Sequence, residues 1–221
     1  MKLNLGCGAN FFPGWVNVDR EDMSEYLSAL ATVDETSLAR WPEHQQKLAK
    51  HVKAGEVTCE IWDLRQGFPS IADNSVDAIY LGQIIEHLNV IYEAPSLMSH
   101  CMRVLRPGAP IRLTTPDLDL LIDAYRDGTL GRFATEQPEF YPKAVPSMQL
   151  SLLMFGASGP HCTWDHYEGH FATYSKESMH ALLHGSGFVE IEFHCKSAEF
   201  DDAIDQGMSH SLAAEGRKPV E

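Results

Sequence analysis

Short hydrophobic runs alternate with longer polar stretches along the chain, and their spacing separates strands from helices. Seven runs are short, apolar or alternating, and end at turn-forming residues, which is the pattern of β-strands: residues 2–5, 16–18, 57–61, 76–81, 111–115, 189–195 and 211–218. Apolar residues spaced three and four positions apart predict helices over 95–105, 118–125 and 175–183, the last capped by Ser175. Strands that alternate with helices are typical of an α/β fold.

Two segments interrupt this alternation. Residues 21–55 carry helix-like spacing in two pieces, 23–31 and 42–52 with Pro42 in a first turn, and we interpret them as an insertion over the sheet. Residues 129–173 are rich in Pro, Gly, His and aromatic residues without a clean period, which predicts a loop-rich cap. A second full domain is not expected at this length, so residues 1–221 are predicted to form a single domain.

Charge narrows the class of partner. Lys and Arg number 17 against 31 Asp and Glu, so the formal net charge is −14, the wrong sign for attraction to nucleic-acid phosphates. A small-molecule partner is therefore favoured over DNA or RNA, and a homodimer is compatible with the sequence. The five cysteines form no Cys-x-x-Cys pair, and no export signal or run of 18 apolar residues occurs, so we expect a cytoplasmic protein with no membrane partner.

Candidate binding residues stand where the predicted strands end. The first strand runs into Gly6-Cys7-Gly8, where two residues without β-carbons let the backbone approach a ligand closely. Asp19 ends the second strand and is placed to accept hydrogen bonds from ribose hydroxyls, while Asp63 and Leu64 end the third and offer an acceptor and an apolar surface for adenine. A plain glycine turn, with both carboxylates as caps, is the alternative.

A set of motifs over about residues 3–120, in a fixed order, indicates which protein family the sequence resembles. They are, in chain order, Leu3-Asn4-Leu5-Gly6-Cys7-Gly8, Pro13-Gly14-Trp15-Val16-Asn17-Val18-Asp19, Trp62-Asp63-Leu64, Asp73-Asn74-Ser75-Val76-Asp77-Ala78-Ile79-Tyr80, Ile85-Glu86-His87-Leu88, Arg103-Val104-Leu105-Arg106-Pro107-Gly108 and Thr115-Pro116-Asp117-Leu118. With them the sequence resembles class I S-adenosylmethionine-dependent methyltransferases. It is most similar to a small subgroup with a type 11-like domain that begins directly at Leu-Asn-Leu-Gly-Cys-Gly.

The resemblance implies both a fold and a cofactor site. The fold is a Rossmann-like, mostly parallel seven-stranded sheet with an antiparallel last strand, helices on both faces and residues 129–173 as a cap on the acceptor side. The co-substrate is S-adenosylmethionine, and the resemblance assigns to it Asn4, Gly6, Cys7, Gly8, Asp19, Asp63, Leu64, Gly82 and Gln83. Two departures are visible: Asn4 replaces an acidic residue of many relatives, and the first crossover helix is nearly absent.

Histidines supply the candidate catalytic groups, because imidazole titrates near neutral pH. His87 follows the fourth strand on the cofactor edge and is a candidate base, with a structural role as the alternative. Residues 161–170 gather His161, His166 and His170 with two carboxylates and two aromatic rings, which predicts acceptor recognition there. A solvated loop and a divalent-metal site are the alternatives; the spacing matches no strong zinc pattern, so no bound metal is expected.

Together these features predict methyl transfer to an oxygen or nitrogen of a small molecule, by analogy in natural-product or glycan biosynthesis. A non-catalytic S-adenosylmethionine-binding protein and a metal-assisted O-methyltransferase using the histidine-rich loop are the alternatives. A nicotinamide-dependent dehydrogenase is disfavoured, because Phe11 stands at the third glycine of that fingerprint and Asp19 comes too early. A base-modifying methyltransferase is disfavoured because Thr115-Pro116-Asp117-Leu118 is not its Asn/Asp-Pro-Pro-aromatic motif.

Overall fold

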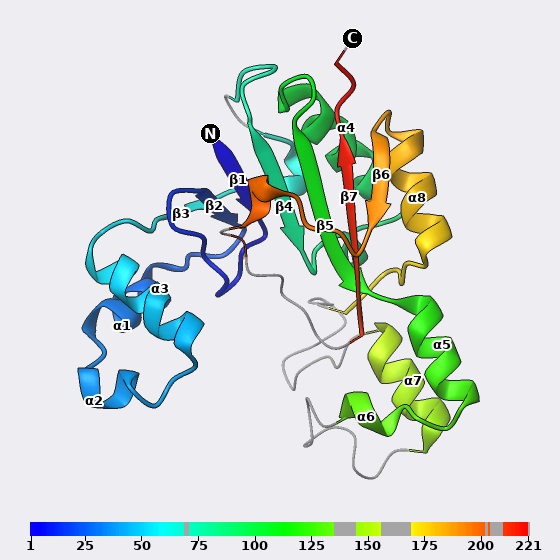
Figure 1. Cartoon of the computed structure of the whole chain (residues 1–221), viewed down its shortest axis with the longest axis horizontal. Helices are drawn as coiled ribbons and strands as arrows, with labels where there is room; N and C mark the ends of the chain where they lie inside the picture. The colour runs from blue at the N-terminus through cyan, green and yellow to red at the C-terminus, as the bar shows by residue number, and fades with distance from the viewer. Residues whose placement is uncertain (69–70, 135–144, 156–168, 202, 204–209, 221) are drawn as a thin grey trace.

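The fold is a seven-stranded mixed sheet with helices around it (Figure 1). The computed structural model describes residues 1–68, 71–134, 145–155, 169–201, 203 and 210–220. The strands are β1 (Lys2–Leu5), β2 (Val16–Asp19), β3 (Cys59–Ile61), β4 (Ala78–Gly82), β5 (Pro110–Pro116), β6 (Val189–Phe193) and β7 (Ser211–Arg217). Their order is β3-β2-β1-β4-β5-β7-β6, and β7 alone runs antiparallel to its neighbours, as the resemblance predicts.

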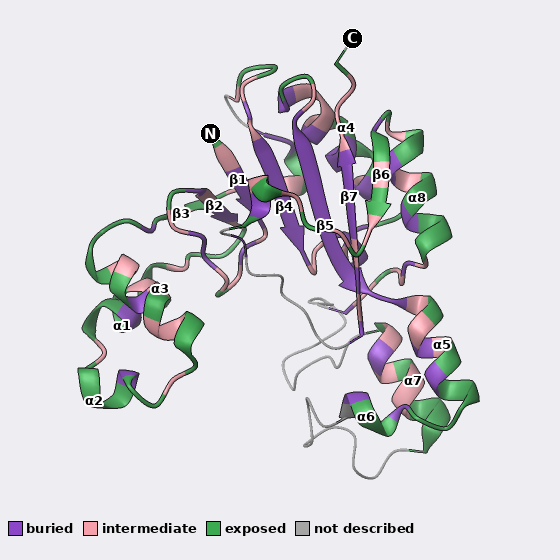
Figure 2. Ribbon diagram, in the orientation of Figure 1, coloured by how far each residue is buried: buried purple, intermediate pink, exposed green. Residues whose placement is uncertain are grey.

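The central strands are mostly buried and largely apolar because both of their faces are covered. Figure 2 shows β1, β4, β5 and β7 as the buried middle of the molecule, while β6 at the edge is largely exposed. Burial on both sides replaces the alternating pattern of a half-exposed strand with a continuous apolar run.

Helices α4 (Glu93–Val104) and α8 (Lys176–Gly185) pack on one face of the sheet and bury apolar side chains with those of the strands. On the other face, Tyr80 packs with Phe12, Trp15 and Phe200, which come from the turn after β1 and from the 3₁₀ turn η3 (Ala198–Phe200). Aromatic rings from these short turns thus take a place where the resemblance implies helices. The described residues of the 6–15 connection contain no helix, in agreement with the missing first crossover.

The element boundaries follow local capping chemistry. The Ser175 hydroxyl accepts a hydrogen bond from the Ser178 amide and begins α8, as predicted. Asp117 caps α5 (Leu118–Arg126) through the Leu120 amide in the same way. Most predicted boundaries differ from the observed ones by one or two residues, the usual uncertainty at the ends of elements.

The insertion forms a small helical unit of its own. Its helices are α1 (Ser24–Thr32), α2 (Glu35–Leu38) and α3 (Glu43–Lys53), so Pro42 precedes α3 instead of standing in its first turn. Leu30, Leu38 and Ala49 form its own apolar cluster. Figure 1 shows the unit beyond the β3 edge, not over the sheet as predicted. The reason is that it packs on Phe11, Val57 and the edge strand.

The segment predicted as a loop-rich cap contains helices α6 (Gly131–Ala134) and α7 (Pro146–Phe155). Helix α7 packs against α5 through Leu153 and Leu121. Its apolar residues are distributed around the helix instead of along one stripe, so the sequence carries no helical period there. The loop-rich prediction was wrong for this stretch. Within the described part of the chain, no helix is both long and apolar enough to cross a membrane.

Candidate functional site

One cleft of about 470 Å³ opens where the carboxyl ends of β1, β2 and β4 meet. Parallel strands end at a common edge, and ligands of such sheets bind there. The cleft is lined by Gly6, Asp19, Arg20, Glu21, Trp62, Asp63, Leu64, Arg65, Gln83, Ile84, His87, Leu88, Glu93, Gly169 and Phe171. Segments that are far apart in the sequence therefore line the same cleft. The volume of the cleft is in the range of small-molecule sites.

Gly6 forms the floor of the cleft next to Ile84. Its φ is +64°, a backbone conformation that disfavours residues with a β-carbon. A β-carbon at this position would also lie 2.1 Å from Cδ1 of Ile84, far inside van der Waals contact. Both constraints require glycine, and they leave the backbone of the turn open to a ligand.

We expect Gly6→Ala to lower the free energy of unfolding by about 2–4 kcal/mol, from left-handed strain together with overpacking against Ile84. Gly55→Ala is the matched control, because Gly55 has φ +72° and a β-carbon there would meet no atom within 4 Å. Its expected cost is about 1–2 kcal/mol from backbone strain alone. Urea unfolding of both variants measures the difference, and equal losses would contradict the contact with Ile84.

Asp19 connects the glycine turn to the second strand. Its Oδ2 accepts a hydrogen bond of 2.8 Å from the Gly8 amide, and its Oδ1 accepts one of 3.1 Å from the Glu21 amide. The carboxylate is thereby held in one orientation at the cleft wall. Each oxygen retains a further lone pair for a donor such as a ribose hydroxyl.

Asp63 and Leu64 lie across the cleft from the glycine turn, at the start of the 3₁₀ turn η1 (Leu64–Gln66). The Asp63 carboxylate accepts two hydrogen bonds of 2.8 Å from Nε and Nη2 of Arg65. It also caps η1 through the Arg65 amide, so the capping alternative describes part of its role. The Arg65 guanidinium lowers the pKa of Asp63 to about 2.

The depressed pKa gives a pH prediction with a defined sign. Because the folded pKa lies below the ordinary value of 3.8, the contribution of this ion pair to stability is present above about pH 4 and is lost as the pH falls toward 2. A carbon-13 titration of the Asp63 carboxyl should give a midpoint near 2. In Arg65→Ala the midpoint should move toward 3.8, whereas Arg40→Ala should leave it unchanged; a midpoint indifferent to Arg65 would contradict the pairing.

Four of the nine residues assigned to the cofactor do not line the cleft. Asn4 is buried and donates hydrogen bonds to the Asn10 carbonyl and the Asn17 side chain. These two bonds hold the glycine turn in place. The Cys7 thiol packs away from the cleft, 3.6 Å from that of Cys59. The other two are Gly8, whose amide holds Asp19, and Gly82, where a β-carbon would meet the Tyr80 ring at 2.7 Å.

Gln83 is the predicted residue at the methionine end that does line the cleft. It has φ +57° in the turn after β4, and its amide donates to the Thr114 carbonyl at 2.8 Å. Its side chain donates to the Ser211 hydroxyl at 3.3 Å. These two bonds connect the turn to β5, which neighbours β4, and to β7, which lies beyond β5.

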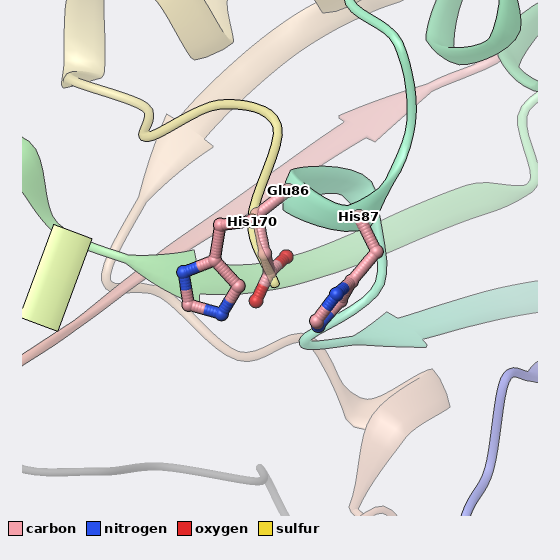
Figure 3. A group of neighbouring side chains, drawn as sticks. All are labelled: Glu86, His87 and His170. Carbon is pink, nitrogen blue, oxygen red and sulfur yellow. The ribbon is translucent and has the colours of Figure 1, made fainter. Parts of the chain in front are cut away.

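Glu86, His87 and His170 gather at the other end of the cleft. Their ligand atoms, one on each residue, lie within 4.8 Å of one another, and in Figure 3 the Glu86 carboxylate stands between the two imidazole rings. Glu86 and His87 come from the 3₁₀ turn η2 (Ile85–His87), and His170 comes from the segment after α7. His87 lines the cleft together with Gly169 and Phe171. His161 and His166 lie outside the described residues.

Burial dominates the electrostatics of this cluster. Desolvation raises the pKa of Glu86 to about 8, and it lowers that of His170 to about 4 with a smaller effect of His87. Sequence reasoning did not select Glu86 because a glutamate beside apolar residues is ordinarily solvent-exposed. The signal that was available is its place between Ile85 and His87 at the end of a buried strand.

Comparisons with known proteins agree with this geometry. A family model described as a methyltransferase domain matches residues 3–113. A search of curated proteins gave no match. Solved structures with a similar fold include an S-adenosylmethionine-dependent methyltransferase from Methanosarcina mazei, with 17% identity, 100% of this chain and 92% of that chain covered and a TM-score of 0.51.

A protein from Pyrococcus horikoshii is similar at 13% identity, with 98% of this chain and 81% of that chain covered and a TM-score of 0.51. At these identities the structural likeness shows the fold alone. The family match covers half of the chain and contains the glycine turn, Asp19, Asp63 and His87. The chain therefore belongs to the methyltransferase domain family and is an S-adenosylmethionine-dependent methyltransferase of the Rossmann-like class.

Proposed function

We propose that the cleft binds S-adenosylmethionine between the glycine turn and η1 and transfers its methyl group to an oxygen or nitrogen of a small molecule. The observation that carries the proposal is the continuity of the cleft, which joins Gly6 and Asp19 at one end with His87 and Phe171 at the other. Cofactor and acceptor can then occupy one cleft with their reacting atoms side by side.

The cofactor end offers a group for each part of the nucleoside. The fixed Asp19 carboxylate accepts hydrogen bonds from the ribose hydroxyls, and Leu64 and Trp62 supply an apolar surface for adenine. Asp63, held ionised by Arg65, is an acceptor for the adenine amino group. Gly6 and Gln83 then lie beside the methionine moiety.

The reaction requires alignment more than elaborate catalysis. The lone pair of the acceptor oxygen or nitrogen forms a bond to the methyl carbon while the carbon–sulfur bond breaks. Sulfur retains that electron pair, S-adenosylhomocysteine leaves as a neutral thioether, and the acceptor loses its proton. His87 is the candidate group to receive this proton, since it is the imidazole that lines the cleft.

A small acceptor is favoured by the dimensions and the charge of the protein. Much of the cleft is allotted to the cofactor, and its acceptor end is bounded by His87, Gly169 and Phe171. The net charge of −14 disfavours a nucleic-acid acceptor. Hydroxylated natural-product and glycan intermediates are therefore the first compounds to test.

The experiment is an acceptor screen with S-adenosylmethionine, read by mass spectrometry as S-adenosylhomocysteine and methylated product. Small alcohols, phenols, amines and sugars form one panel, and short peptides and oligonucleotides form another. Turnover with members of the first panel alone supports the proposal. Turnover with macromolecular acceptors alone would overturn it, as would tight cofactor binding without turnover in either panel, which identifies a non-catalytic binding protein.

A further inference from the structure

We propose that Glu86, His87 and His170 form a binding site for a zinc-like divalent metal ion, which holds the oxygen of a hydroxyl acceptor beside the transferred methyl group. The three side chains provide one carboxylate and two imidazoles from two separate segments of the chain. That ligand set is a known one for catalytic zinc, and three protein ligands leave a coordination position open for water or substrate.

The separation of the ligand atoms suits a shared ion. They lie within 4.8 Å of one another. Bonds to zinc of about 2.0–2.2 Å bring ligand atoms to within roughly 4 Å of each other. Side-chain adjustments of about 1 Å therefore close the site, which is a small change for groups with rotatable side-chain bonds.

Both imidazoles carry the supporting contact that metal-binding histidines usually have. Nδ1 of His170 lies 3.0 Å from the Met154 carbonyl, and Nδ1 of His87 lies 3.3 Å from the Gly169 carbonyl. A carbonyl at Nδ1 favours the tautomer with its proton there and makes Nε2 the nitrogen with the lone pair. The two rings are thus oriented as ligands by the backbone.

The backbone also fixes the distance between the two segments. The Phe171 and Ala172 amides donate hydrogen bonds of 2.8 and 3.2 Å to the Glu86 carbonyl. The His170 amide donates to the Phe155 carbonyl at the end of α7. These bonds hold His170 against η2.

The buried carboxylate of Glu86 is a second, independent observation that points to a bound ion. Its exposed fraction is 0%, and neither carboxylate oxygen has a hydrogen-bond partner among the described residues. The neighbouring Thr115 and Tyr174 hydroxyls are likewise unsatisfied within that part of the chain. Buried polar groups are rarely left so, and an ion is one recognised explanation. A cation between Glu86 and the two imidazoles would compensate the negative charge of the buried carboxylate.

A metal at this place changes the expected acceptor chemistry, a consequence that rests on the proposed methyltransferase function. A divalent ion lowers the pKa of a hydroxyl that it binds, so the proton leaves to solvent without a protein base. An alcohol or phenol is then favoured over an amine. His87 would hold the ion instead of accepting the proton.

The test is a cobalt(II) titration of the purified, cofactor-free protein, followed by visible absorption. His180 and His184 stack on the exposed face of α8 and offer a competing surface site, so all variants carry His180→Ala and His184→Ala. We expect one saturable site, weakened at least 10-fold by His170→Ala or by the near-isosteric Glu86→Gln. His51→Ala, at an exposed ion pair, should have no effect. Urea unfolding verifies that each variant folds.

Absence of binding, or equal binding by all variants, would overturn the metal site. If the ion binds but a chelator leaves methyl transfer to a hydroxyl acceptor unchanged, the proposed role in catalysis is overturned. Failure of the methyltransferase proposal gives a different result, namely no S-adenosylhomocysteine from any acceptor with or without metal. The two proposals can therefore fail separately.

Discussion

Replacement of Glu215 by alanine should lower the free energy of unfolding by about 3–5 kcal/mol, because it removes a carboxylate that is paired with a buried arginine. Arg112 on β5 and Glu215 on β7 are directly opposite in the antiparallel pair, and both are at least nine-tenths buried. Nη1 of Arg112 lies 2.6 Å from Oε1 of Glu215. Glu215 also accepts the Ser197 amide at 3.1 Å, so one carboxylate joins two strands and the segment after β6.

Two further variants distinguish loss of the ion pair from general damage to the sheet as the cause of the lower stability. Glu199→Ala removes a carboxylate from the exposed pair with Arg217 and should cost less than about 1 kcal/mol. The double variant Arg112→Met with Glu215→Leu should recover most of the lost stability, since apolar residues of similar volume can replace a buried ion pair. Urea unfolding measures all three. A loss for Glu215→Ala no larger than that for Glu199→Ala would contradict the assignment.

The strand-end residues of the candidate cofactor site could be expected to lie together from the sequence, because their meeting depends on the topology of the sheet. Gly6, Asp19 and Asp63 each end a parallel strand, and parallel strands bring those ends to one edge. Asn4 and Cys7, in the same motif as Gly6, were assigned to the cofactor by the resemblance. Both side chains are buried and contact other parts of the protein, Asn4 at Asn10 and Asn17 and Cys7 at Cys59.

The residues at the proposed acceptor end were harder to predict from the sequence, because they meet only through tertiary contacts. His170 reaches Glu86 by way of hydrogen bonds to η2 and α7, and no local pattern encodes that meeting. Helix α7 itself has no apolar stripe by which a period can be recognised. Glu86 is buried against the general tendency of glutamate, and such local conflicts concentrate at functional sites.

The largest functional effect is expected for Asp19→Ala, which should weaken S-adenosylmethionine binding by about 100- to 20,000-fold. Two hydrogen bonds from the ribose hydroxyls to a carboxylate contribute about 1.5–3 kcal/mol each, and 1.4 kcal/mol corresponds to a factor of ten. The variant also releases the Gly8 amide, which Asp19 holds at 2.8 Å, so the glycine turn loses a fixed contact. Calorimetric titration with S-adenosylmethionine and S-adenosylhomocysteine measures the loss.

Two substitutions distinguish ribose recognition from damage to the turn. Asp22→Ala removes a carboxylate that caps the Ser24 amide outside the cleft lining, and cofactor affinity should be unchanged. Asp19→Asn keeps the shape of the side chain and one acceptor oxygen, so a loss near 10-fold is expected from a single impaired hydrogen bond. If Asp19→Ala binds the cofactor as tightly as the original protein, ribose is not held at β2, and the nucleoside must then be oriented differently in the cleft.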